Sequence, residues 1–188
     1  MKHILIIGGT GMLQGTTAQC IEDGDKVTIV GRNPRRLAYF TEKYPKSAKN
    51  MYLLAVDYTD TTQFIKGIEE AVQNLGKITD AIVWMHGSGR ATLLKLLAYL
   101  HQQNERCRIF HLQGSAVYNP ENLEDKDLQE QIFSLTLDYH QIILGFVLEE
   151  GYARWLSHKE IAEGTYNAFS QNKDRKIIGT TTPWDKRP

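Results

Sequence analysis

Four glycines near the start of the chain have the spacing of a turn that could hold phosphate groups. They are Gly8, Gly9, Gly11 and Gly15, and they link the apolar run His3–Gly8 to a helical pattern over Thr16–Ile21. Glycine permits a tight turn and lets the backbone approach a diphosphate, because no Cβ stands in the way. The free N–H groups and the positive end of the following helix would then bind the phosphates.

This turn predicts nucleotide or dinucleotide binding, because it follows a strand, precedes a helix and stands at the start of an alternating chain. The residues expected to contact the ligand are Gly8, Gly9, Thr10, Gly11, Met12 and Leu13. The alternative is a glycine turn that serves only to pack a helix against a strand.

A cluster of arginines follows the second apolar run, Lys26–Gly31. Arg32, Arg35 and Arg36 fall within five positions, and no carboxylate stands there to bond the ribose hydroxyls of NAD. Arginine makes forked, charge-assisted bonds to phosphate, and a cation in the first turn of a helix is unfavourable unless an anion lies nearby. The 2′-phosphate of NADP would be that anion. We therefore expect NADP(H) rather than NAD(H), with Arg32, Asn33 and Arg36 at the site; a solvated basic helix end is the alternative.

Strand-like and helix-like patterns that would position these residues alternate along the chain. The apolar runs are His3–Gly8, Lys26–Gly31, Met51–Asp57, Asp80–Gly87, Arg108–Gly114, Gln141–Glu149 and Lys176–Thr180. Continuous apolar runs of this length are typical of parallel strands that are buried on both faces. Helical patterns fill the gaps, with start signals at Asn33-Pro34, at Asp60 and in a capping box that begins at Ser157.

This alternation predicts an α/β fold, a Rossmann-type doubly wound, mainly parallel sheet of about seven strands. We expect a single domain over residues 1–188, because that length suits one hydrophobic core. The polar and acidic segment Asn119–Asp138 has no clear period, and we expect a loop there with one short helix.

Composition and charge exclude several classes of protein. Lys and Arg number 22, as do Asp and Glu, and this zero net charge argues against a nucleic-acid or anionic membrane surface. No apolar run approaches the length of a membrane span. The two cysteines, Cys20 and Cys107, lack the spacing of a zinc site, so we expect reduced thiols and no metal. We expect a cytoplasmic protein without nucleic-acid or membrane partners.

Gly-Gly-Thr-Gly-Met-Leu at positions 8–13 resembles the Gly-x-x-Gly-x-x-Gly turn of the short-chain dehydrogenase/reductase superfamily, although the third glycine stands at Gly15 instead of position 14. The resemblance implies further contacts with the cofactor. Asp57, in Val-Asp-Tyr-Thr-Asp, would contact the adenine, with Tyr58 beside it. His86 and Gly87, at the end of the fourth strand, would also border the cofactor. A capping role for Asp57 and a hydrogen-bonding rim position for His86 are the alternatives.

Ser-Ala-Val-Tyr at positions 115–118 resembles the Ser-Ala-x-Val-Tyr-Gly segment of extended superfamily members. The resemblance implies that Ser115 bonds a substrate carbonyl or hydroxyl. In the family a tyrosine then acts as acid and base, and a lysine four residues later lowers its pKa, which is otherwise about 10. Tyr139 is a candidate for that tyrosine, but Ile143 stands where the lysine would be, so the dyad is lacking. The candidate catalytic residues are Ser115, Tyr118 and Tyr139.

Three functions compete. The superfamily is mostly enzymatic, which favours an NADP(H)-dependent oxidoreductase of a small carbonyl or alcohol substrate. The missing lysine favours instead a catalytically inactive NADP(H)-binding sensor or a regulatory or interaction protein. A sugar-nucleotide epimerase relative ranks last, because no residues remain for a separate substrate domain. Members of the superfamily often form dimers or tetramers, so the resemblance also implies a homo-oligomer.

Overall fold

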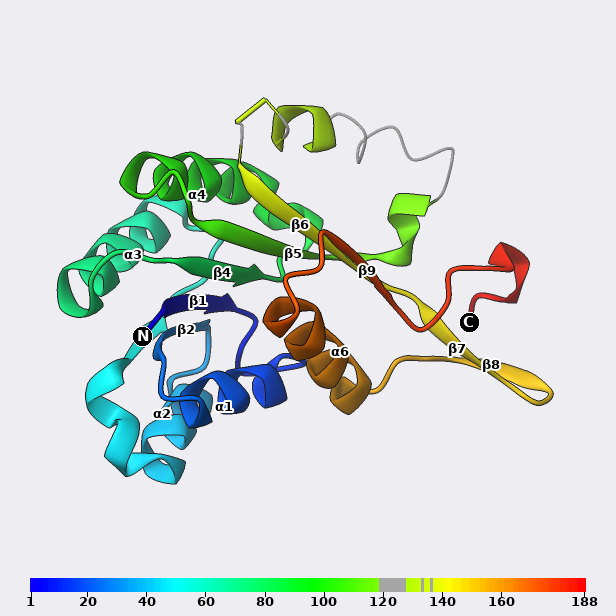
Figure 1. Ribbon diagram of the computed structural model, residues 1–188, viewed down its shortest axis with the longest axis horizontal. Coiled ribbons are helices and arrows are strands. Elements are labelled where there is room, and N and C mark those ends of the chain that lie inside the picture. The colour runs from blue at the N-terminus through cyan, green and yellow to red at the C-terminus, as the bar shows by residue number, and fades with distance from the viewer. Residues whose placement is uncertain (119–127, 133, 136) are drawn as a thin grey trace.

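The computed structural model describes residues 1–118, 128–132, 134–135 and 137–188 (Figure 1). Within them, seven parallel strands form one sheet in the order β3-β2-β1-β4-β5-β6-β9. Their bounds are β1 His3–Ile7, β2 Lys26–Gly31, β3 Met51–Ala55, β4 Asp80–Val83, β5 Arg108–Gly114, β6 Asp138–Leu144 and β9 Arg175–Ile178. The strand order reverses direction between β1 and β4, and in such sheets ligands bind beyond the carboxyl ends of the strands at that point.

Helices cover both faces of this sheet (Figure 1). One face carries α1 Gln14–Glu22, α2 Pro34–Lys43 and α6 His158–Ser170, and the other carries α3 Thr61–Leu75 and α4 Arg90–Gln103. In β1, Ile4 and Ile6 pack in the first of these layers, whereas Leu5 and Ile7 pack in the second. Successive side chains of a strand point to opposite faces, so a strand covered on both sides must be apolar throughout. The predicted doubly wound parallel sheet is confirmed.

The helix start signals are also confirmed. The Asn33 side chain accepts hydrogen bonds from the N–H groups of Arg35 and Arg36, at 3.0 Å and 3.3 Å. Asp60 caps α3, and a reciprocal capping box with Ser157 as N-cap opens α6. These caps satisfy N–H groups that have no partner within the helix.

The prediction of one continuous strand over Gln141–Glu149 is wrong. β6 ends at Leu144, and a new strand, β7 Phe146–Glu149, pairs antiparallel with β8 Tyr152–Trp155 in a hairpin that projects from the main sheet (Figure 1). The break is at Gly145, where the backbone passes so close to Thr180 that a side chain would collide with it. The Phe146 N–H donates to the Thr180 carbonyl at 2.9 Å, and this contact between distant segments redirects the strand.

The segment that was expected to be an irregular loop is described in part. Residues 119–127, 133 and 136 lie outside the described residues, and residues 128–132 are helical. No helix in the described part of the chain combines the length and apolar character that a membrane span requires.

Candidate cofactor and substrate site

The glycine turn joins β1 to α1 at the reversal point of the sheet. Gly8 has φ +89°, and the Gly11 N–H donates to its carbonyl at 3.1 Å, which closes the turn. A Cβ on Gly9 would lie 2.8 Å from Thr17 Oγ1, so this glycine allows α1 to approach the sheet. No side chain caps α1 at Leu13. The Gln14 N–H donates to the Gly11 carbonyl at 3.0 Å. The next N–H groups of α1 have no side-chain acceptor and can bind an anion.

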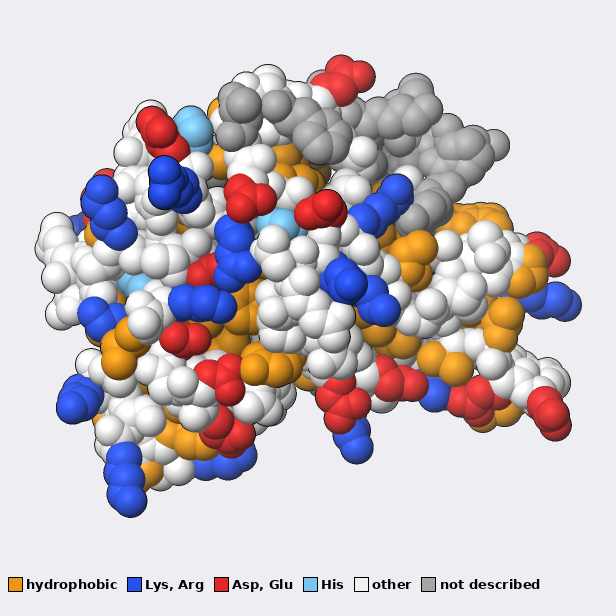
Figure 2. Space-filling model, in the orientation of Figure 1, with side chains coloured by type: hydrophobic (Ala, Val, Ile, Leu, Met, Phe, Trp, Pro, Cys, Tyr) orange, Lys and Arg blue, Asp and Glu red, His pale blue; other side chains and the backbone are white. Residues whose placement is uncertain are grey.

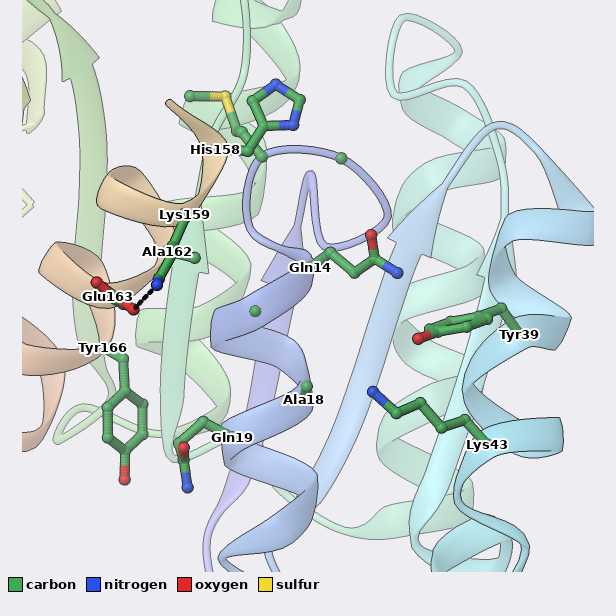
Figure 3. Close-up of a pocket in the computed structure, with 13 residues that line it drawn as sticks. Gln14, Ala18, Gln19, Tyr39, Lys43, His158, Lys159, Ala162, Glu163 and Tyr166 are labelled. Carbon is green, nitrogen blue, oxygen red and sulfur yellow. Dashed lines mark ion pairs between the residues drawn. The ribbon is translucent and has the colours of Figure 1, made fainter. Parts of the chain in front are cut away.

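The turn residues divide into those that face a cavity and those that pack inward. Gly11 and Thr10 line a cavity of about 500 Å³ beside the start of α1. Met12 lines an adjoining groove of about 460 Å³, drawn in Figure 3. Leu13 is fully buried in the core, so only its backbone is available to a ligand.

Basic side chains from α2 complete the cavity beside Thr10. Arg35 and Arg36 line it together with Gln14, Tyr39 and His158. Figure 3 shows Tyr39 on α2 and Gln14 at the start of α1 on facing sides of the adjoining groove. No ion pair in the described part of the chain uses Arg35 or Arg36. Two cations without a counter-ion beside a helix N-terminus form an environment that suits phosphate.

The other two predicted residues of this basic segment have different surroundings. Arg32 does not line the cavity; its Nη1 lies 3.9 Å from Asp57 Oδ2, and both side chains are exposed. Asn33 uses its side-chain oxygen to cap α2. Arg35, which the sequence analysis did not assign to the site, lines the cavity with Arg36; its place in the first helical turn was the available signal.

Asp57 and Tyr58 follow the carboxyl end of β3. The N–H and hydroxyl of Thr59 donate to Asp57 Oδ1 at 3.0 Å and 2.8 Å. These bonds, and then the charge of Arg32, hold the pKa of Asp57 below its usual value. The Tyr58 hydroxyl accepts the His86 N–H at 3.3 Å, so the segments after β3 and β4 are tied together beside the expected adenine position.

Ser115 stands directly after β5 and is 3% exposed. It lines a cavity of about 260 Å³ together with Trp84, Trp155, Leu156 and Arg187. Trp84 comes from the end of β4, and a Cβ on Gly8 would lie 3.3 Å from the Trp84 Cβ, so this cavity adjoins the glycine turn. The structure thus brings the predicted serine next to the predicted cofactor turn.

Tyr139 is not brought to Ser115. It is the second residue of β6 and pairs in register with Ile109, near the amino end of β5, whereas Ser115 follows the carboxyl end. Its hydroxyl lies 2.6 Å from His111 Nδ1, and burial raises its pKa above the usual value. Ile143, four residues on, is buried in the same strand. This placement argues against a catalytic role for Tyr139.

Tyr118 ends the 3₁₀ turn Ser115–Tyr118, and its side chain lies outside the described residues. His86 and Gly87 line a cavity of about 230 Å³ between the carboxyl ends of β4 and β5, which shares Trp84, Gly114 and Ala116 with the cavity of Ser115. The imidazole of His86 makes an edge contact with Trp84, with ring centres 5.4 Å apart.

Two polar residues of this cavity were not predicted from the sequence. His111 and Gln113 are buried and line it from β5. Burial lowers the pKa of His111 to about 4, so the imidazole is neutral at pH 7. The available signal was the alternation of polar side chains at 111 and 113 within an apolar strand. Within the described residues, no group of three or more His, Cys, Asp or Glu could hold a metal ion.

Comparison of the sequence with models of known families identifies the family of this chain. The sequence model of the short chain dehydrogenases matches residues 2–108, so the chain belongs to the short-chain dehydrogenase family. Short-chain dehydrogenases are a family of oxidoreductases. Membership of this family implies a nicotinamide dinucleotide cofactor and a small substrate. No curated protein sequence matched the chain.

Solved structures of the same family share the fold. A betaketoacyl-ACP reductase from Bacteroides thetaiotaomicron has a TM-score of 0.71 and 15% identity, covering 96% of this chain and 98% of that one. A short chain dehydrogenase from Bacillus anthracis has a TM-score of 0.66 and 15% identity, with coverage of 96% and 95%. A short chain oxidoreductase from Pseudomonas aeruginosa, described as containing an atypical catalytic center, has a TM-score of 0.69 and 14% identity, with 97% of each chain covered.

Proposed function

We propose that this protein binds NADP(H) at its glycine turn and interconverts a small carbonyl compound and the corresponding alcohol. The observation that carries the proposal is the cavity where Thr10 and Gly11 meet Arg35 and Arg36 beside the start of α1. Backbone N–H groups at a helix N-terminus suit a diphosphate, and forked guanidinium groups suit the additional 2′-phosphate.

The described residues divide into a cofactor part and a substrate part. The turn from Gly8 to Leu13 would hold the diphosphate, Arg35 and Arg36 the 2′-phosphate, and the segments after β3 and β4 the adenosine. When bound, the nicotinamide supplies or accepts the hydride. Ser115 would bond the substrate oxygen in the adjoining cavity. The remaining candidates for the proton donor are Tyr118, His86 and water.

Titration calorimetry with NADPH, NADP, NADH and NAD tests the cofactor assignment. The wild type should prefer the phosphorylated pair, and the Arg35→Ala/Arg36→Ala variant should lose about ten-fold or more in NADPH affinity with little change for NADH. Lys77→Ala is the control, because it removes an exposed cation that precedes the amino end of β4, whereas the site lies beyond the carboxyl ends of the strands. Equal affinity of the wild type for NADPH and NADH would refute the preference, and no binding of any dinucleotide would refute the proposal.

A second candidate function is NADP(H) binding without turnover, as in a sensor or regulatory protein. Two observations on β6 favour it: Tyr139 pairs with Ile109 and so lies away from Ser115, and an apolar Ile143 stands where the family has a lysine. NADPH oxidation across a panel of small carbonyl compounds discriminates the two functions. Turnover that falls at least about ten-fold in Ser115→Ala, but not in the control Ser47→Ala in the 3₁₀ turn Pro45–Asn50, supports the enzyme. Tight binding with no turnover supports the sensor.

We further infer that residues 1–188 act as one domain in the cytoplasm, without nucleic-acid or membrane partners, and that the protein forms a homo-oligomer. Side chains of both charges are interspersed on the face shown in Figure 2, which supports the absence of a nucleic-acid surface. Leu148 and Tyr152 are exposed on the β7–β8 hairpin and would be covered in an oligomer. Sedimentation of the wild type and of Tyr152→Ser measures the oligomeric state.

A further inference from the structure

A charged residue from the end of the chain shares the cavity of Ser115. Arg187 follows the 3₁₀ turn Trp184–Lys186, and this last segment returns beside β7 (Figure 1). The described residues that line the cavity are Trp84, Gly114, Ser115, Ala116, Leu144, Gly145, Trp155, Leu156, Ile161 and Arg187. Among them Ser115 supplies the one hydroxyl and Arg187 the one charge, while the others are apolar or glycine.

Two indole rings hold the Arg187 guanidinium. Its central carbon lies 5.3 Å from the centre of the Trp155 ring and 4.9 Å from that of Trp184. Figure 2 shows hydrophobic side chains gathered at this end of the molecule, over β7 and β8. These contacts position the guanidinium without pairing its N–H donors with an oxygen acceptor.

Arg187 differs from the neighbouring Arg154 in its ion pairs. Arg154 pairs with Glu149 at 2.6 Å and with Glu160 at 2.9 Å, and it thereby fastens the hairpin to α6. No ion pair in the described part of the chain engages Arg187. A positioned guanidinium without a counter-ion among the described residues, at the edge of a cavity that is apolar apart from Ser115, is suited to bind an anion from solution.

We propose that Arg187 binds a carboxylate of the substrate, and that the substrate class is therefore small oxo acids and the corresponding hydroxy acids. This inference rests on the proposed function, because it places the carbonyl or hydroxyl at Ser115. The forked guanidinium matches the two oxygens of a carboxylate. The apolar lining between the two residues suits a short carbon chain, and the volume of about 260 Å³ limits its length.

Matched acids and amides test this proposal directly. The probes are pyruvate, acetoacetate and 4-oxopentanoate, each compared with its primary amide, which has nearly the same size but no charge. Dissociation constants are measured by calorimetry on protein saturated with NADP, and NADPH oxidation is followed with the same compounds. The variants are Arg187→Gln and the control Lys186→Gln, which removes the adjacent exposed charge outside the cavity.

At least one acid should bind the wild type and Lys186→Gln about ten-fold or more tightly than its amide, and Arg187→Gln should abolish the difference. Equal binding of every acid and its amide, no binding of any acid, or a preference that persists in Arg187→Gln would each overturn the assignment of Arg187 while NADP still binds. Failure of NADP itself to bind would overturn the proposed function, and this inference with it. The separate cofactor titration therefore distinguishes the two failures.

Discussion

Gly15 of α1 lies against Ala162 of α6, so close that a Cβ on Gly15 would be 2.9 Å from the Ala162 Cβ. Next to this contact, the Thr16 hydroxyl donates to the Ala162 carbonyl at 2.9 Å. Both contacts join the two helices on one face of the sheet. The displaced third glycine of the turn therefore serves the approach of α6 to α1, whereas Gly9 serves the approach of α1 to the sheet.

Gly15→Ala should accordingly lower the free energy of unfolding and leave NADPH affinity unchanged. Overpacking costs roughly 1–3 kcal/mol, and the better helix propensity of alanine offsets roughly 1 kcal/mol, so we expect a net loss of about 1 kcal/mol. Urea denaturation measures it. The control is Gly15→Ala/Ala162→Gly, which removes the colliding methyl group and should recover the loss attributable to overpacking. A loss of NADPH affinity at unchanged stability would contradict this role.

Gly11→Ala should have the opposite effects. The nearest atom to a Cβ at this position is the Gly8 carbonyl oxygen at 3.8 Å, an ordinary contact distance, so the fold has room for alanine. Gly11 lines the proposed phosphate cavity, where a methyl group would keep the diphosphate from the backbone. We expect stability within about 0.5 kcal/mol of the wild type and NADPH affinity about ten-fold lower. Calorimetry measures the NADPH affinity and urea denaturation measures the stability, on one preparation. Unchanged affinity would show that the diphosphate does not bind at Gly11.

Asn33→Asp should reduce the preference for NADPH without loosening α2. Aspartate caps a helix as well as asparagine does, so the bonds from the N–H groups of Arg35 and Arg36 are kept. The new carboxylate would repel the 2′-phosphate and pair with these arginines. We expect about ten-fold weaker NADPH binding and little change for NADH.

Asn33→Ala is the control for that variant. It should lose about 1 kcal/mol of stability, because the cap is removed, and keep the preference for NADPH, because no charge is added. Asn33→Asp with an unaltered preference would show that the 2′-phosphate does not lie near Arg35 and Arg36.

The strands were predictable where their signal is local. β1 and β2 lie within the predicted runs, because strands covered on both faces must be apolar at every position. The end of β6 was not predictable in this way. The run Gln141–Glu149 has apolar residues on both sides of Gly145, so its pattern shows no break. The break depends on a contact with Thr180, which no local pattern encodes.

The same distinction applies to the candidate site. The glycine turn and Arg36 belong to one β-α-β segment, so their proximity follows from the fold class. The place of Arg187 beside Ser115 depends on how the last residues return to the sheet, and its sequence surroundings carry no corresponding signal. Tyr139 was chosen by its distance along the chain from Ser115, and the parallel register of β6 separates the two.

Acid should destabilise the protein through His111, which is buried and hydrogen-bonded to Tyr139. Its pKa is about 4 when folded and about 6.5 when unfolded. Between these values the unfolded chain binds a proton that the folded protein does not, so this contribution to stability is present above pH 6.5 and is lost as the pH falls to 4. The loss amounts to about 3 kcal/mol at most and levels off below pH 4.

Urea denaturation between pH 7 and pH 4 measures this dependence. Burial also lowers the pKa of His3, which contributes in the same direction in every variant, so the comparison is between slopes. His111→Asn should flatten the decline of the unfolding free energy by up to about 3 kcal/mol over this range, and it retains an amide to face the Tyr139 hydroxyl. The exposed control His158→Asn should keep the wild-type slope. If His111→Asn declines as steeply as the wild type, the imidazole must already accept a proton in the folded state, and the cavity between β4 and β5 would have to admit water to it.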